Sequence, residues 1–353
     1  MSFGPDHYVP VLKIKRGEKA ALRLLAPSFW PRITPLLEIV ERRSERSPDE
    51  HLETAFKGLA ESVGAYPYFF LDLRELAPDG AAVAAKVFGR AADAGMAFIP
   101  VTGISRGADL DAAKAHRSGG LALRLTREEF ERGDLATKLN RFMTTHGLAH
   151  EETDLIVDLG PVDDMIAPGV MAFAEAFLAD VPEHLRWRSF TISSCAFPRG
   201  MGGLERHSYD FVDRIDWIAW RDCLLARRED IPRLPTFSDG AIQHPAGVEG
   251  FNPAIMQASA SVRYTLAEKW LRIKGQGLRT KSGSLQFPSL ATRLVYGDLR
   301  GHYAGQDHCE GCRLIKLAAD GAPKLGSLEA WRRLGTVHHI AVVIQGLGLP
   351  PGP

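Results

Sequence analysis

The sequence lacks several features that would place it in a class at once. Its 43 lysines and arginines balance its 43 aspartates and glutamates, so no charge of one sign covers the molecule as in a non-specific nucleic-acid coat. With 45% hydrophobic residues it differs from a disordered chain. No apolar run reaches eighteen residues, and the N-terminal segment has no uninterrupted apolar stretch. We therefore expect no membrane span, no secretory signal and a cytoplasmic protein.

Cysteine and phosphate-binding glycine motifs are also scarce. The cysteines Cys195, Cys223, Cys309 and Cys312 are too few for a disulfide framework in 353 residues, so reduced thiols are expected. No GxGxxG or GxxxxGK[ST] motif follows the first predicted strand, which removes the usual sign of a Rossmann or P-loop sheet.

Short apolar runs alternate with longer amphipathic segments over roughly the first 240 residues, a βαβα pattern typical of a parallel sheet. We expect eight strands, over residues 9–15, 33–40, 68–75, 97–104, 121–126, 154–160, 188–194 and 235–241. Helices are expected between them, over residues 17–26, 47–64, 80–95, 135–147, 167–181 and 209–228. A doubly wound open sheet would give the same local pattern. The count of eight and the polar strand ends favour an α/β fold of the (β/α)8 TIM-like barrel type.

The residue pattern changes after the eighth predicted strand. Residues 259–277 indicate two strands joined by a turn, and residues 286–298 could form the eighth barrel helix. Residues 302–323 are expected to be mainly loop, and residues 327–348 to be helical. We therefore divide the chain into a barrel (1–245) and a C-terminal elaboration (246–353) that packs on the barrel mouth, with no flexible linker between them.

Charged residues follow apolar ones at the ends of nearly every predicted strand. Since residues two apart on a strand share a face, these side chains should converge at the barrel mouth. They are Lys13, Lys15, Glu38, Asp72, Arg74, Arg124, Asp158 and Asp239, with Ser193 beside them. Burying unpaired charge is costly, so the ring should either bind something or close on itself as internal ion pairs. Both alternatives stay open at this point.

The mixed signs of this ring predict phosphate chemistry. We assign ligand binding to Lys13, Arg74, Arg124 and Ser193, because arginine contacts phosphate or carboxylate through two hydrogen bonds. We assign acid, base or Mg²⁺-ligating roles to Glu38, Asp72, Asp158 and Asp239, and a catalytic role to Lys15. Together these residues would suit a metal-dependent phosphoester hydrolase.

The C-terminal segment holds a second group, with a Cys-x2-Cys pair near several histidines. We predict a zinc site from His308, Cys309, Cys312 and His339. Consecutive helical residues point about 100° apart, so only one of His338 and His339 should face a shared metal. Two alternatives stay open. One is a loop with buried thiols and locally bonded histidines, and the other is that Cys309 or a histidine completes the barrel-mouth site as a nucleophile or as an acid or base.

The predicted hairpin is both aromatic and basic, with Arg263, Tyr264, Trp270, Arg272 and Lys274. Such a hairpin could clamp a nucleotide or a nucleic-acid strand, and we assign Arg263 and Tyr264 to this role. The alternative is an amphipathic hairpin whose cations reach solvent.

The segments FGPDHYVPVLKIKRGEKAAL, ITPLLEIV, FLDLREL, TFSDGAIQHP, HCEGCRLIK and WRRLGTVHHIAVV resemble the beta protein family of bacteria and phages. The resemblance implies a setting of phage–host conflict rather than a defined reaction. We thus expect a phage-defence protein that binds a phosphorylated ligand, nucleotide or nucleic-acid end and could hydrolyse it, with Mg²⁺ or Zn²⁺ as the candidate cofactor. The alternative is a non-catalytic recognition or scaffold subunit that acts with a partner nuclease or senses a phage component.

Overall fold

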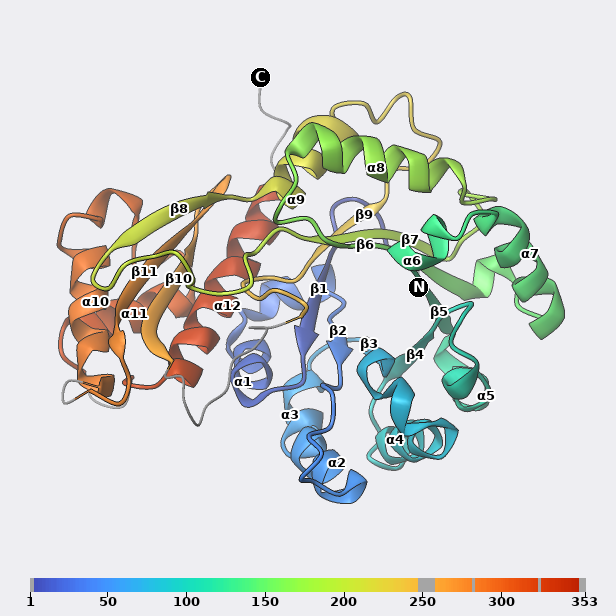
Figure 1. Cartoon of the computed structure of the whole chain (residues 1–353), viewed down its shortest axis with the longest axis horizontal. Helices are drawn as coiled ribbons and strands as arrows, with labels where there is room; N and C mark the ends of the chain where they lie inside the picture. Colours follow the sequence, from blue (N-terminus) through green and yellow to red (C-terminus); the bar gives the residue numbers. More distant parts are fainter. Residues whose placement is uncertain (1–2, 247–257, 281–282, 323–324, 349–353) are drawn as a thin grey trace.

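Figure 1 shows the computed structural model, which describes residues 3–246, 258–280, 283–322 and 325–348. Eight parallel strands close into a barrel in which β1 pairs with both β2 and β9. The barrel strands are β1 (Tyr8–Lys13), β2 (Leu36–Glu38), β3 (Phe69–Asp72), β4 (Phe98–Thr102), β5 (Leu121–Thr126), β6 (Thr153–Pro161), β7 (Ser189–Cys195) and β9 (Thr236–Asp239). The predicted (β/α)8 TIM-like barrel is confirmed, and each of the eight predicted strands is present.

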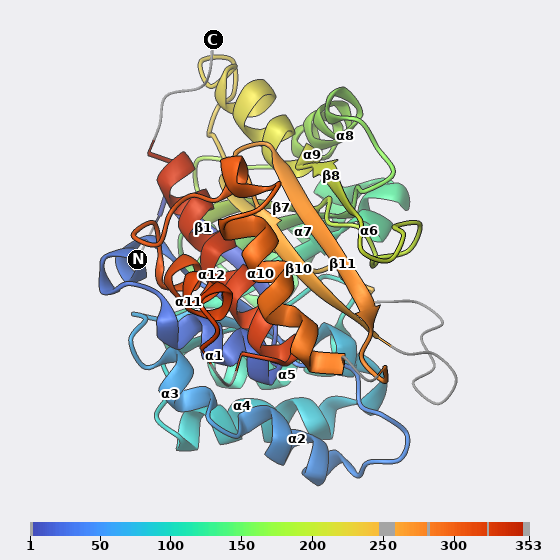
Figure 2. The same cartoon turned by 90° about the vertical axis from the view of Figure 1, so that its left-hand side faces the viewer.

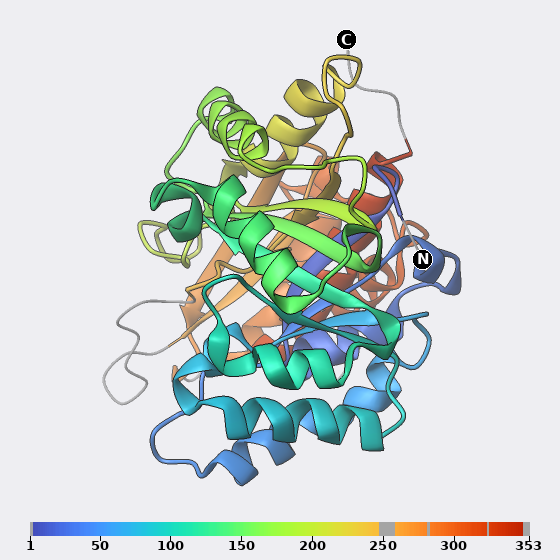
Figure 3. The same cartoon turned by 90° about the vertical axis from the view of Figure 1, so that its right-hand side faces the viewer.

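Helices cover the outside of the barrel, as Figure 3 shows for the side built from residues 80–180. The α-helices of residues 3–246 are α1 (Arg16–Leu24), α2 (Pro48–Phe56), α3 (Leu59–Val63), α4 (Ala81–Asp93), α5 (Gly107–Ala115), α6 (Arg127–Glu131), α7 (Leu135–His146), α8 (Ala167–Ala179) and α9 (Ile215–Ile218). The start of α2 is fixed by its sequence. Ser47 and Glu50 form a reciprocal capping box, and Pro48 occupies the first turn, where no backbone donor is needed.

A second sheet, antiparallel and three-stranded, lies beside the barrel (Figure 2). Its order is β10 (Ser259–Thr265), β11 (Lys269–Gly277) and β8 (Tyr209–Asp213). The predicted hairpin is confirmed as β10 and β11. The prediction of one helix over 209–228 is wrong at its start, because residues 209–213 pair with β11 instead. Cross-strand ion pairs favour that pairing: Arg272 Nε donates to Asp210 Oδ1 over 2.9 Å.

The C-terminal helices α10 (Phe287–Val295), α11 (Glu310–Ala319) and α12 (Leu328–Gly346) share an apolar core with β10 and β11 of the second sheet. The prediction that residues 286–298 form the eighth barrel helix is wrong. Phe287 and Leu290 of α10 belong to a core with Val262 and Leu271 of the second sheet, away from the barrel. The helix that lies against the barrel is α12, which packs on α1 and contacts β1 and β10 (Figure 1). The predicted loop over 302–323 is also corrected, because it contains α11.

Three apolar cores support this arrangement. The largest lies between the barrel strands and the surrounding helices, a second fills the C-terminal sheet and its helices, and a small one fills the barrel interior. Within the described residues, no helix has the length and apolarity that crossing a bilayer requires.

Candidate functional site

The barrel interior changes from apolar to charged along each strand. The apolar layer consists of Val9, Leu36, Phe70, Ile99, Val101, Ala122 and Ile156. On four strands a charged residue follows two positions after a residue of this layer. The pairs are Leu36 and Glu38, Phe70 and Asp72, Ala122 and Arg124, and Ile156 and Asp158. Because alternate residues share a face, each of these charged side chains lies above the apolar layer, at the carboxyl end of its strand.

Arg124 joins three of the four predicted carboxylates in one buried network. Its Nη1 lies 2.6 Å from Glu38 Oε1 and 2.7 Å from Asp72 Oδ2. Its Nη2 lies 2.7 Å from Asp158 Oδ2, and all four side chains are at most 5% exposed. The structure thus brings Glu38, Asp72, Arg124 and Asp158 together, as predicted from the strand ends.

Two further arginines extend the network, and one of them, Arg74, reaches solvent. Arg74 Nη1 donates to Asp158 Oδ2 over 3.1 Å, and this side chain is 31% exposed. Arg106 forms an ion pair of 2.7 Å with Asp72 and another with Asp109. Sequence reasoning missed Arg106 and Asp109, because they lie beyond the end of β4 rather than on it. Arg106 lies at the carboxyl end of β4 as the N-cap of α5, and Asp109 lies in the first turn of that helix. This position just after a barrel strand is the signal that could have identified them.

The arginines determine the ionisation of the carboxylates. Burial alone would raise the pKa of Asp72, but the positive charges of Arg106 and Arg124 outweigh it and hold the pKa well below its usual range. Burial also acts to raise the pKa of Asp158. The positive charges of Arg124 and Arg74 outweigh burial, so the pKa of Asp158 is lowered overall. These two carboxylates are therefore ionised at neutral pH and are not available as proton donors.

A pocket of about 410 Å³ opens above the network at the carboxyl ends of the strands. Its lining includes the basic residues Lys13, Arg74, Arg106, Arg124, Arg127 and Arg132 and the acidic residues Glu38, Glu128, Glu129 and Asp158. Ser193 also lines it, and this hydroxyl accepts a hydrogen bond from Ser238 over 3.1 Å. The volume is that of a site for one small ligand.

The lysines of the first strand differ in position. Lys13 lines the pocket and forms an ion pair with Glu75. Lys15 lies beyond the end of β1 as the N-cap of α1, and its side chain is exposed and outside the pocket lining. Lys15 would face the barrel mouth only if the strand continued to it, but β1 ends at Lys13.

The predicted orientation of Asp239 is wrong. Its neighbour Phe237 belongs to the core outside the barrel, so Asp239 also points to the helix layer and is absent from the pocket lining. There its carboxylate accepts hydrogen bonds from Tyr8 and from His339 Nε2, the latter over 3.0 Å. On β9 the residue that faces the barrel interior is Ser238, one position earlier.

The hairpin residues do not present a stacking surface to a ligand. The ring of Tyr264 is fully buried and stacks on His338 with the ring centroids 3.9 Å apart. Arg263 is partly buried, lies over the Phe197 ring and donates to the backbone carbonyl of Ile242 over 2.5 Å. The prediction that Tyr264 clamps a base is therefore wrong, because the aromatic face of this hairpin packs inside the protein.

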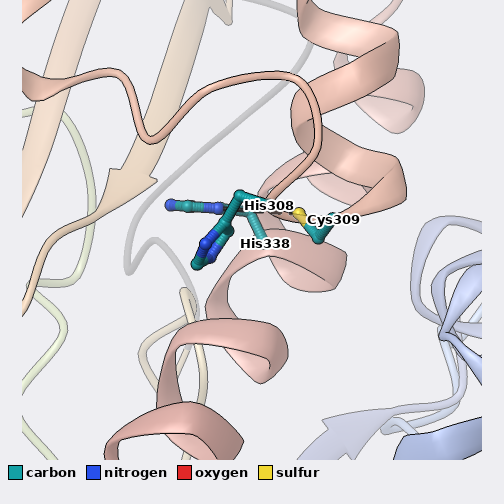
Figure 4. Close-up of side chains that lie close together, drawn as sticks. All are labelled: His308, Cys309 and His338. Carbon is teal, nitrogen blue, oxygen red and sulfur yellow. Dashed lines mark hydrogen bonds between the residues drawn. The ribbon is translucent and has the colours of Figure 1, made fainter.

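The cysteines and histidines of the C-terminal segment do converge, with one replacement (Figure 4). Ligand atoms of His308, Cys309 and His338 lie within 4.8 Å of one another, and Cys312 Sγ lies 3.2 Å from His338 Nδ1. His339, which we predicted as a ligand, bonds to Asp239 instead. A hydrogen bond from the Cys312 thiol, together with the His338 ring, lowers the pKa of Cys309 to about 4.

The fold and the pocket define the chain as a (β/α)8 barrel protein with a ligand-sized site at the carboxyl ends of its strands and a second sheet beside it. The family described as Beta protein matches residues 8–345, nearly the whole length. The chain therefore belongs to the beta protein family, as its sequence segments indicated. A comparison with curated proteins finds no match.

Proposed function

We propose that the barrel mouth binds a phosphorylated small ligand, such as a nucleotide or the end of a nucleic acid. The observation that carries this proposal is the surplus of basic side chains in the pocket lining, six against four acidic ones. Arg132 is exposed and makes no ion pair with the described residues, and Arg74 is held by Asp158 yet remains partly exposed. Guanidinium groups suit phosphate because each donates two parallel hydrogen bonds.

The same geometry supports binding over hydrolysis. Each of Glu38, Asp72 and Asp158 is already paired with a guanidinium, so a Mg²⁺ ion would have to displace Arg124 to reach these oxygens. A general base also needs a free acceptor near the substrate. His244, which lines the pocket, does not offer one: Nδ1 accepts from the Ala246 amide over 3.1 Å, so the proton of the neutral ring is on Nε2, 3.4 Å from Asp163.

Cys195 is the thiol in the pocket lining, and it is not activated. Burial raises its pKa well above the usual value, and its Sγ donates to the Gln243 carbonyl over 3.1 Å. A nucleophilic cysteine requires the opposite, a lowered pKa beside a positive charge. These contacts favour a recognition protein. The role in phage defence stays a prediction that rests on the family resemblance, and action with a partner nuclease stays a prediction from the sequence.

Calorimetric titration of the full chain tests this function. We expect AMP, ADP or ATP to bind with an affinity that falls as salt rises, and adenosine not to bind. A double variant, Arg127→Gln with Arg132→Gln, removes two pocket arginines. Because a hydrogen bond to a charged group contributes about 1.5–3 kcal/mol, we expect affinity to fall at least tenfold.

The matched control is Arg186→Gln. Like Arg127, which pairs with Glu131, Arg186 is an exposed arginine paired with a glutamate, Glu151. It precedes β7 and so lies at the amino end of the barrel. This variant should bind as the wild type does. Equal affinity in the pocket variant and the control, or no binding of any phosphorylated ligand, would refute the proposal. Chromatography of the ligand after incubation checks for hydrolysis, which we do not expect.

A further inference from the structure

We propose that His308, Cys309, Cys312 and His338 bind one structural Zn²⁺ ion, which holds the start of α11 against α12. This metal site is separate from the barrel-mouth pocket and does not depend on the function proposed for it. Its ligands come from two places in the chain: His308, Cys309 and Cys312 lie at the start of α11, and His338 lies in the middle of α12. Figure 4 shows His308, Cys309 and His338.

Two sulfur–nitrogen distances are close to those of tetrahedral coordination. With Zn–S bonds of about 2.3 Å and Zn–N bonds of about 2.0–2.1 Å, neighbouring ligand atoms of a tetrahedral site lie roughly 3.3–3.8 Å apart. Cys309 Sγ lies 3.7 Å from His338 Nδ1, and Cys312 Sγ lies 3.2 Å from the same nitrogen. The ligand atoms of His308, Cys309 and His338 all lie within 4.8 Å of one another, and Cys312 joins this group through its contact with His338.

His338 is oriented as a ligand histidine. Its Nε2 lies 2.8 Å from the backbone carbonyl of Thr265, which fixes the proton on Nε2 and leaves the Nδ1 lone pair facing the sulfurs. Metal-bound histidines nearly always donate their second nitrogen to such an acceptor. The stacked ring of Tyr264 holds the imidazole plane, and the whole His338 side chain is buried.

His308 provides a second, independent indication. Its Nε2 is buried and has no hydrogen-bond partner among the described residues. A buried polar atom without a hydrogen-bond partner destabilises the folded state. A metal ion bound to His308 would supply the missing partner. Local hydrogen bonds satisfy the thiols of Cys309 and Cys312, but among the described residues none satisfies His308 Nε2.

The backbone is shaped to bring the sulfurs to His338. Cys309 is the N-cap of α11, and its Sγ accepts from the Cys312 amide over 3.4 Å. Between them Gly311 lies against α12: a Cβ built there would be 2.6 Å from the Leu334 carbonyl oxygen and 3.2 Å from the His338 amide nitrogen. A residue without a side chain is therefore required for the Cys-x2-Cys turn to reach the histidine.

Metal analysis and native mass spectrometry of the full chain, purified under reducing conditions, test the site. We expect about one zinc per chain in the wild type. Cys309→Ser with Cys312→Ser, and separately His338→Gln, should reduce zinc occupancy at least tenfold. Cys223→Ser, a free cysteine outside the cluster, should keep full occupancy.

Cobalt substitution in the wild type provides a reading that does not depend on whether the variants fold. Tetrahedral Co²⁺ with two thiolates gives strong visible bands and a thiolate charge-transfer band, whereas adventitious octahedral Co²⁺ gives neither. Absence of these bands, failure of the reduced protein to take up Zn²⁺, or a Cys309–Cys312 disulfide in the freshly purified protein would overturn the proposal.

Discussion

His338 and His339 are consecutive residues of α12, yet their rings lie in two different clusters. His338 Nδ1 lies 3.2 Å from Cys312 Sγ, whereas His339 Nε2 lies 3.0 Å from Asp239 Oδ2 at the end of β9. Successive helical residues point about 100° apart, so one helix presents one imidazole to each side. Through these two side chains α12 joins the barrel to the C-terminal sheet.

Replacing His339 should affect stability without affecting metal content. In His339→Leu, Asp239 loses a buried donor and Thr265 Oγ1 loses its partner at 3.0 Å. We expect the free energy of unfolding to fall by about 2–4 kcal/mol, measured by urea denaturation. Zinc content should stay at the wild-type level, in contrast to His338→Leu. Loss of metal in both variants would contradict the division of α12 into two faces.

Arg124 should be the most sensitive residue of the barrel mouth. In Arg124→Met the buried carboxylates of Glu38, Asp72 and Asp158 lose their common partner. We expect a loss of about 3–5 kcal/mol in the free energy of unfolding at pH 7. The control Arg186→Met breaks an exposed pair and should cost less than about 1 kcal/mol. Similar losses in both variants would show that the network is not structural.

His7 should make stability dependent on pH. Burial is the main cause that lowers the pKa of His7 to about 4, while an unfolded histidine titrates near 6.5. The folded state therefore keeps His7 neutral, and the unfolded state binds a proton first as pH falls. The stability contribution is complete above about pH 6.5 and is lost as pH falls to about 4, a change of about 3 kcal/mol.

His7→Gln isolates this effect. The amide can still bond to Thr34 Oγ1, which lies 2.8 Å from His7 Nε2, but it does not titrate. The difference in unfolding free energy between the wild type and the variant should change between pH 6.5 and 4 and be constant above pH 7. A difference independent of pH would show that His7 is not titrated on unfolding.

Gly311→Ala should separate α11 from α12. The added Cβ would meet the backbone of Leu334 and His338, which cannot move as a side-chain end can. We expect a loss of about 1–3 kcal/mol and weaker zinc binding in competition with a chelator. Gly301→Ala, where an added Cβ has no atom within 4 Å, is the control. Unchanged zinc affinity in Gly311→Ala would indicate that the close approach is unnecessary.

The barrel could be predicted from the sequence because its strands are short and separated by helices, and alternation then placed Glu38, Asp72, Arg124 and Asp158 together. Alternation alone was not sufficient for Asp239. In a strand of four residues, the face that points inward is determined by the stagger between neighbouring strands, and this stagger is a property of the closed barrel rather than of local sequence.

Long-range contacts account for the other errors. Residues 209–213 have a pattern that also fits a helix, and they become a strand because β11, about sixty residues later, provides hydrogen-bonding partners. The choice between His338 and His339 depends on how α12 is rotated against β10. Arg106 was missed because alternation along strands says nothing about loop residues, although a loop brings it to Asp72.

The origin of β8 has a consequence for how this protein can change by recombination. The outer strand of the second sheet comes from the middle of the barrel sequence, between β7 and β9, while its partner β11 follows the barrel. A genetic exchange at residue 245 would transfer β10 and β11 without β8. The donor would keep β8 without its partner β11. The two parts are therefore expected to be inherited together, and their sequences to vary in concert.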